Sequence, residues 1–146
     1  MSSISHLVRR FATSLSRRPP SASDTAWAVE QMLPAEADLW RRMTVQDRRH
    51  SILVARRFVD LVPSASRPEV AGALLHDVGK LASGLGTFSR VLATVIGPRT
   101  DVFRRYHEHD RLGAEMLAAA GSEVVTIELA HGRGHRAQAL RQADNI

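Results

Sequence analysis

An imidazole and a carboxylate stand side by side in the stretch GALLHDVGKLAS, residues 72–83. The apolar run over residues 70–75 predicts a buried helix with His76 and Asp77 near its end. Burying a charged group without a partner is costly. The pair is therefore hydrogen-bonded in the core, partly exposed, or bound to a cation.

Other histidines lie on apolar faces of predicted helices. His50 begins a stripe of apolar residues at helical spacing that continues to residue 61, so it is expected to face the core. His109 and His131 are spaced in the same way from apolar neighbours, and Asp144 lies one turn after Leu140. A lone histidine on such a stripe is more often a hydrogen-bonded core residue, but several from distant segments favour a central metal site in a helical bundle. The candidate ligands are His50, His76, Asp77, His109, His131 and Asp144.

Helices must position these side chains, because almost every segment from residue 24 onward has a helical pattern and none has convincing strand alternation. The predicted N-caps are Asp24, Thr44, Ser66 and Ser122. We therefore predict an all-α fold, a compact bundle of roughly seven to nine helices. The predicted helices cover residues 25–33, 35–42, 45–62, 67–81, 87–97, 100–106, 109–120, 123–131 and 135–144.

Two regions differ in composition. Residues 1–23 are rich in arginine and serine, contain no acidic residue and resemble a transit peptide; we interpret them as a mobile basic arm. Residues 24–146 are predicted to form one helical domain. The chain has no cysteine, so a metal ion would have to bind His, Asp or Glu.

The net charge of +5 favours anionic ligands such as phosphates. A nucleic-acid partner is not favoured, because no basic face interleaved with aromatic residues and no zinc-finger spacing is present. No run of about 18 apolar residues occurs, so we expect no membrane span and a cytoplasmic location. The sequence does not indicate an oligomeric state.

The order of His50, His76-Asp77 and Asp144 on a helical background resembles the HD-domain superfamily of metal-dependent phosphohydrolases. HDVGK (76–80) is similar to the HD(I/V)GK of the phosphodiesterase-like branch, and HEHDRLGAEMLAAAG (107–121) is similar to its HPxxGAxxL segment. ELAHGRGH (128–135) and ALRQADNI (139–146) resemble the segments that carry the later histidine and the terminal aspartate. The GYP motif of cyclic-di-GMP phosphodiesterases is missing.

This resemblance implies a metal centre and an activity. The expected substrate is a nucleotide or another small phosphate mono- or diester, cleaved by metal-activated water. The cofactor is expected to be one or two divalent ions of Mn, Fe, Zn, Mg, Co or Ni. One ion would be held by His50, His76, Asp77 and Asp144, and a second by His109 and His131, with Asp77 bridging.

Lys80 is the only lysine of the chain and lies at i+3 from Asp77. We predict that it holds a substrate phosphate; its alternative is a lysine that interacts with the dipole at a helix C-terminus. Arg111, like Arg104 and Arg105, is a weaker candidate for substrate binding, with a solvated charge as the alternative. His107 and His135 are candidates for the acid that protonates the leaving group.

Three other interpretations remain open. A diiron HD-type oxygenase would bind iron tightly and turn over with O₂. A non-catalytic, metal-stabilised regulatory or binding module would keep the ligands without turnover. A helical bundle with hydrogen-bonded core histidines would bind no metal.

Overall fold

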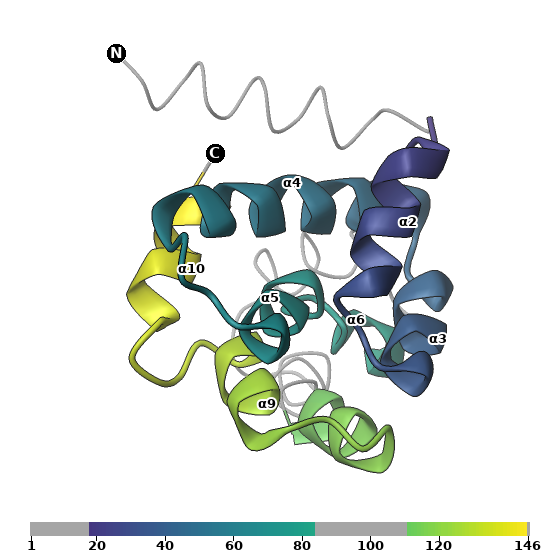
Figure 1. Cartoon of the computed structure of the whole chain (residues 1–146). Helices are drawn as coiled ribbons and strands as arrows, with labels where there is room; N and C mark the ends of the chain where they lie inside the picture. Colours follow the sequence, from purple (N-terminus) through teal and green to yellow (C-terminus); the bar gives the residue numbers. More distant parts are fainter. Residues whose placement is uncertain (1–17, 84–110, 146) are drawn as a thin grey trace, which may run out of the picture.

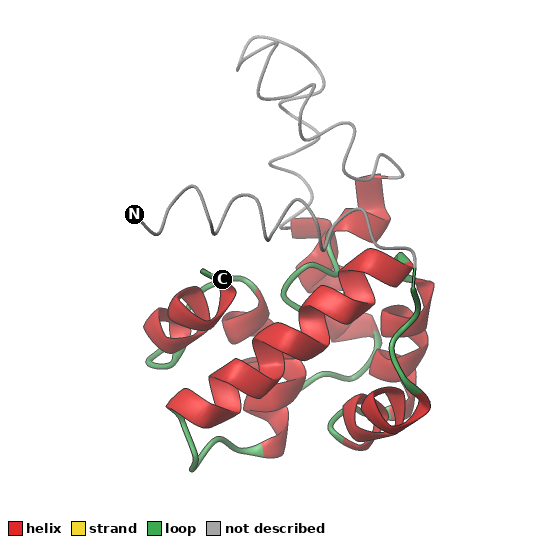
Figure 2. Cartoon of the chain, turned by 90° about the horizontal axis from the view of Figure 1, so that it is seen from above, coloured by secondary structure: helices red, strands yellow, loops and turns green. Residues whose placement is uncertain are grey.

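Helix is the regular secondary structure throughout the part of the chain that the computed structural model describes, residues 18–83 and 111–145. Figure 2 shows these helices joined by loops, and no strand is found among the described residues. The predicted all-α fold is confirmed, whereas the helices predicted over 87–97 and 100–106 lie outside the described ranges. In chain order the helices are α2 (Ala22–Glu30), α3 (Pro34–Arg42), α4 (Val45–Leu61), α5 (Arg67–Leu74), α6 (Lys80–Ser83), a helix over 111–119, α9 (Val124–Ala130) and α10 (Ala137–Asp144).

Helix α5 lies at the centre of the bundle (Figure 1). It packs against α4 and α9, and α10 packs against α4. Residues 69–74 of α5 are all buried, so the helix has no solvent-facing side over this stretch. At Gly72 a Cβ would lie 3.0 Å from the Cβ of Leu129, which shows how closely α5 and α9 approach. The turn that follows α5 therefore begins inside the protein.

A buried hydrogen bond ties α3 to α4. Trp40 is fully buried, and its indole Nε1 donates to Ser51 Oγ at 2.9 Å. Because an indole N–H without a partner is costly to bury, this pair fixes how α3 sits on α4. Helix α4 in turn carries His50, Val54 and Phe58 on one side. The latter two are fully buried, as the apolar stripe predicts.

Two of the four predicted N-caps are confirmed. Thr44 Oγ1 accepts the backbone N–H of Asp47 at 3.1 Å, and Ser66 Oγ accepts that of Glu69 at 3.3 Å. The Glu69 carboxylate also accepts the backbone N–H of Ser66, which completes a capping box. These bonds set where α4 and α5 begin.

The other two predicted caps are wrong. Helix α2 is capped by Ser21, which accepts the N–H of Asp24, so Asp24 lies in the first turn instead. Ser122 donates its hydroxyl to the buried Glu36 carboxylate at 2.6 Å, and the N-cap of α9 is Glu123. A buried carboxylate needs donors, and this requirement outweighs the local preference of Ser122 for a helix start. Residues 1–17 of the predicted arm lie outside the described residues.

The helix predicted over 67–81 is wrong in its second half. Helix α5 ends at Leu74, and residues 75–79 form turns before α6 begins at Lys80. The N–H of Val78 bonds the carbonyl of Leu75 at 2.9 Å, and that of Lys80 bonds the carbonyl of Asp77 at 3.1 Å. These i→i−3 bonds wind the backbone more tightly than an α-helix does. His76 and Asp77 consequently project from a turn.

No described helix is both long and apolar enough to cross a bilayer.

Candidate metal centre

Three side chains from separate segments converge on one point. They are His50 on α4, His76 in the turn after α5, and Asp144 at the end of α10. His50 Nε2 lies 2.8 Å from Asp144 Oδ1, and His76 Nε2 lies 3.5 Å from the same oxygen. One donor atom from each of the three falls within 4.8 Å of the other two. Helix packing thus brings together two histidines and one carboxylate that lie 26 to 94 positions apart in the sequence. These three residues are among the six predicted ligands.

The ring of His76 is oriented by the helix that precedes it. Its Nδ1 donates to the carbonyl of Ala73 at 2.7 Å, which directs Nε2 toward Asp144 and Asp77. Nε2 is buried and has no hydrogen-bond partner among the described residues, since both carboxylate contacts are 3.5 Å long. A histidine that binds a metal commonly donates its other ring N–H to a backbone carbonyl in this way.

The electrostatics of this group favour a positive charge at its centre. Burial by itself would lower the pKa of His76, but the neighbouring Asp77 and Asp144 carboxylates raise this pKa to about 9. Burial would likewise raise the pKa of Asp144, whereas its contacts with His50 and His76 hold this pKa well below the usual range. His76 is therefore protonated at neutral pH unless a metal cation replaces that proton.

The donor set fits a divalent transition-metal ion. Two imidazoles and one carboxylate suit Mn, Fe, Co or Zn. Mg and Ca, in contrast, prefer sites made of oxygen atoms alone. Two ligand atoms about 2.1 Å from one ion lie at most about 4.2 Å apart, and both distances to Asp144 Oδ1 are shorter than this. The buried Nε2 of His76, which has no hydrogen-bond partner within the described ranges, is the further sign that a ligand belongs here. His50, His76 and Asp144 are the residues that would hold the ion.

Asp77 and Lys80 form a second charged group beside the first. Lys80 Nζ donates to Asp77 Oδ2 at 3.2 Å and to Asp47 Oδ1 at 2.9 Å. The alternative of a lysine at the C-terminus of a long helix does not apply, because α6 begins at Lys80. Asp47 is not among the residues predicted from the sequence, although its position three residues before His50 places it one turn away on the same side of α4.

The predicted second ion site is described only in part. His131 ends α9 and donates Nδ1–H to the carbonyl of Ile127 at 2.8 Å. Its Nε2 lies against the backbone of Gly113, where a Cβ would be 3.2 Å away, and it is not among the three converging residues. His109 lies outside the described residues. The two-ion arrangement, with Asp77 bridging, stays a prediction.

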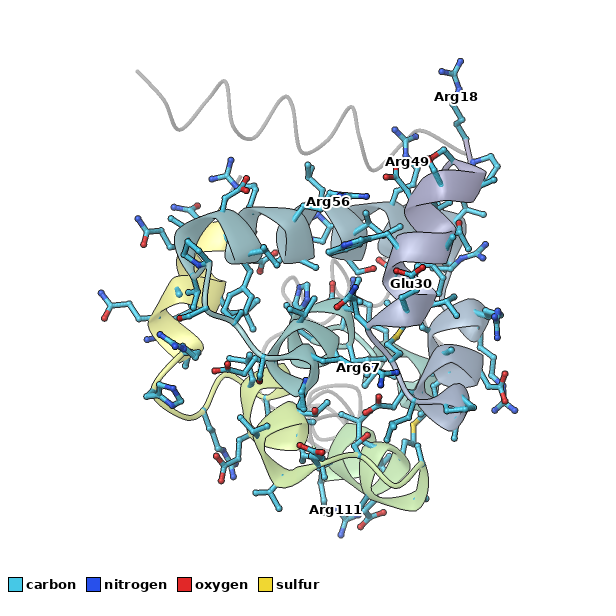
Figure 3. The ribbon with its side chains drawn as sticks, viewed as in Figure 1. Arg18, Glu30, Arg49, Arg56, Arg67 and Arg111 are labelled. Carbon is cyan, nitrogen blue, oxygen red and sulfur yellow. The ribbon has the colours of Figure 1, made fainter. Side chains whose placement is uncertain are left out.

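The remaining predicted residues lie elsewhere or are not described. His135 is exposed, with Nε2 3.7 Å from Glu69 Oε2, in a group that Arg136 also joins. Arg111 is exposed on the helix over 111–119 and projects outward (Figure 3). His107, Arg104 and Arg105 fall outside the described ranges.

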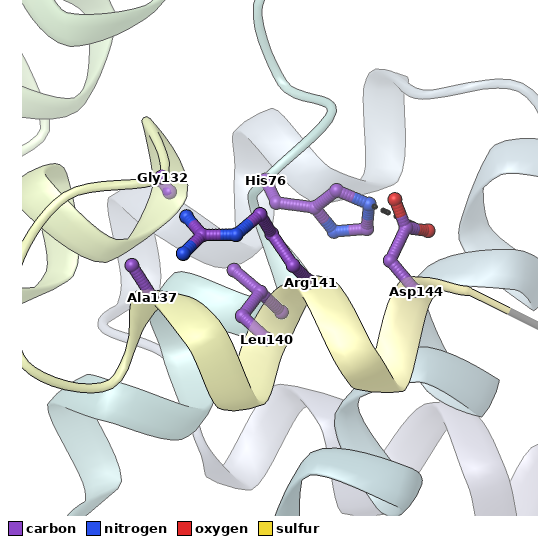
Figure 4. A pocket seen from close by; sticks show the side chains of 7 residues that line it. His76, Gly132, Ala137, Leu140, Arg141 and Asp144 are labelled. Atoms are coloured by element: carbon purple, nitrogen blue, oxygen red, sulfur yellow. Dashed lines mark ion pairs between the residues drawn. The ribbon is translucent and has the colours of Figure 1, made fainter.

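A small cavity opens beside the converging residues. It measures about 160 Å³, and His76 and Asp144 form part of its wall (Figure 4). The rest of the wall comes from α10 and from the segment after α9. A ligand in this cavity would be in contact with the candidate metal centre. The other lining residues are Ala130, Gly132, Ala137, Leu140 and Arg141.

Comparison with protein-family models, with curated proteins and with solved structures finds no match for this chain. The similarity to HD-domain phosphohydrolases accordingly rests on the motifs of the sequence.

Proposed function

We propose that this protein is a metal-dependent phosphohydrolase that cleaves a small phosphate ester. The observation that carries this proposal is the convergence of His50, His76 and Asp144, with a buried His76 Nε2 that has no hydrogen-bond partner among the described residues. The order and local context of these residues are those that the HD-domain resemblance requires. Both lines of support concern the same side chains: one is their order along the sequence, and the other is their convergence in the fold.

Each residue has a distinct part in the proposed chemistry. His50, His76 and Asp144 hold the cation, and the Ala73 carbonyl fixes the His76 ring. A divalent ion in such a site polarises a phosphoryl oxygen and acidifies water. Asp77 lies next to His76, so its carboxylate is placed to accept a proton or to add a ligand.

Lys80 orients Asp77 in this scheme. Its ammonium group lies between Asp77 and Asp47, both within hydrogen-bonding distance, and it is mostly buried. In this position it lowers the cost of keeping the Asp77 carboxylate charged inside the protein. A phosphate that approached Asp77 would also meet this positive charge, which is the predicted role of Lys80 in substrate binding.

The experiment is a paired measurement of metal content and hydrolysis. The protein is purified without chelator or affinity tag, and metal per chain is measured by plasma mass spectrometry. Hydrolysis of para-nitrophenyl phosphate and of bis(para-nitrophenyl) phosphate is then assayed with Mn²⁺, Fe²⁺, Zn²⁺, Co²⁺ and Mg²⁺. The variants are His76→Asn and Asp77→Asn, and the matched control is Asp60→Asn, an exposed carboxylate on α4.

We expect the wild type and Asp60→Asn to bind metal and hydrolyse at least one ester. His76→Asn should lose metal and hydrolysis together, and Asp77→Asn should lose hydrolysis by at least about a hundredfold. Hydrolysis that survives in His76→Asn would refute the proposal. Metal binding without turnover on a broad panel of phosphate esters would instead favour the regulatory or binding module.

One observation also favours the alternative of an iron-dependent oxygenase. Two histidines and one carboxylate are the donor set of non-haem iron oxygenases. The metal analysis separates the two functions. Bound iron together with O₂-dependent turnover, and no ester hydrolysis with any of the five ions, would support the oxygenase.

A further inference from the structure

Arg141 is a cation in the wall of the cavity that the metal centre shares. It lies on α10 one turn before Asp144 and lines the same cavity as His76 and Asp144. Figure 4 shows these three side chains around the cavity, with the guanidinium end of Arg141 extended toward Gly132. The side chain makes no hydrogen bond or ion pair with any residue in the described ranges. Its five N–H donors are thus available to a ligand.

A nearby arginine shows the contrast. Arg136 precedes α10 by one residue, and its Nε donates to Glu69 Oε2 at 3.1 Å. The charge of Arg136 is therefore used within the protein. In the cavity wall the carboxylate is Asp144, which His50 and His76 already contact. Among the described residues that line the cavity, Asp144 is thus the only carboxylate that Arg141 meets.

The size and lining of the cavity limit which ligands can bind in it. A volume of about 160 Å³ is below the range of roughly 300–1,000 Å³ that drug-sized ligands occupy. Its remaining side chains, Ala130, Ala137 and Leu140, are apolar and offer no competing hydrogen bonds. A cavity of this size accommodates one compact group, and Arg141, His76 and Asp144 all line it. Since a guanidinium binds two oxygens of a phosphate in parallel, that group is best matched by a phosphoryl group.

We propose that Arg141 binds the phosphoryl group of a phosphate monoester and so selects monoesters over diesters. This inference rests on the proposed function and names its substrate class. A monoester phosphoryl group has three non-bridging oxygens, so it can present two to the guanidinium and one toward His76 and Asp144. A diester has two, so it cannot satisfy the guanidinium fork and the metal centre together.

The experiment measures binding of inorganic phosphate by calorimetry and hydrolysis of the two nitrophenyl esters. Phosphate is titrated into metal-free protein and into protein loaded with Mn²⁺, for the wild type, Arg141→Gln and Arg141→Lys. The matched control is Arg57→Gln, because Arg57 is an exposed arginine of α4 that does not line the cavity. Metal content is measured for every variant.

We expect Arg141→Gln to weaken phosphate binding by about tenfold or more in both forms of the protein. Its KM for para-nitrophenyl phosphate should rise by a similar factor at unchanged metal content. Arg141→Lys should recover only part of the loss, because a lysine offers a point charge without the planar fork. Arg57→Gln should match the wild type, which should also hydrolyse the monoester faster than the diester.

Several outcomes would overturn the inference. It is wrong if Arg141→Gln binds phosphate as the wild type does, or if the wild type binds none, even where ester hydrolysis confirms the proposed function. It is also wrong if the wild type prefers the diester. Phosphate binding that depends on Arg141, in a protein without hydrolysis, would uphold the anion site and refute the proposed function.

Discussion

Metal binding should stabilise the fold, and Asp144 should be required for that effect. Asp144 is the last residue of α10 and joins this helix to His50 on α4 and to His76 after α5. An ion held by all three would therefore connect three segments that separate on unfolding. We predict that Zn²⁺ or Mn²⁺ raises the melting temperature of the wild type and not that of Asp144→Asn.

The magnitude follows from linkage and from the exposure of Asp144. At a free ion concentration of 100 Kd, an ion that binds only the folded state adds about 2.7 kcal/mol to the free energy of unfolding. For a domain of this length that corresponds to roughly 10 °C in melting temperature. Without metal, Asp144→Asn should cost about 1–2 kcal/mol, less than a fully buried pair would, because the Asp144 side chain is 33% exposed.

The assay is differential scanning calorimetry of protein stripped with chelator and then supplied with one ion. Asp60→Asn, an exposed carboxylate substitution on α4, is the matched control and should show the wild-type shift. An equal shift in Asp144→Asn would refute the assignment of Asp144 as a ligand. No shift in the wild type at millimolar ion would refute the metal centre itself and return the histidines to core hydrogen bonding.

Two further predictions concern the packing and the charges that support the site. Gly113→Ala should destabilise the protein by about 1–2 kcal/mol in urea denaturation, because its Cβ would lie 3.1 Å from Gly79 Cα and the overpacking exceeds the gain in helix propensity; stabilisation would contradict this packing. Burial by itself would raise the pKa of Glu69, but hydrogen bonds from Ser66 and the contact with Arg136 lower it below 4.5. The stabilisation from Glu69 is therefore present above about pH 4.5 and is lost as the pH falls through the lowered pKa, so Glu69→Gln should flatten the acid side of the stability curve. An unchanged acid slope would contradict this role for Glu69.

Local signals predicted the fold class and the starts of two helices. Thr44 and Ser66 are followed three residues later by Asp47 and Glu69, and their caps require only neighbours in sequence. The end of α5 could not be found in this way. The apolar pattern continues past Leu74, whereas the backbone leaves the α-helix there, close to the helix over 111–119.

The part of the candidate site that could be predicted from the sequence consists of histidines on apolar helix faces. His50 and His76 stood out because burying an imidazole needs an explanation, and the structure brings them together with Asp144. Asp47 and Arg141 gave no such signal, since charged residues on helices are usually solvated. The proposed role of Asp47 depends on its contact with Lys80, which lies 33 residues away in the sequence. That of Arg141 depends on a cavity that only the folded bundle forms.

The charges of the site favour a positive charge at its centre. Asp47, Asp77 and Asp144 supply three carboxylates, and Lys80 neutralises one of them through contacts of 2.9 and 3.2 Å. His76 adds a further positive charge when it is protonated, as its pKa of about 9 implies at neutral pH. A divalent ion in place of that proton would add one further positive charge. The carboxylates that raise the pKa of His76 would attract a metal cation for the same electrostatic reason.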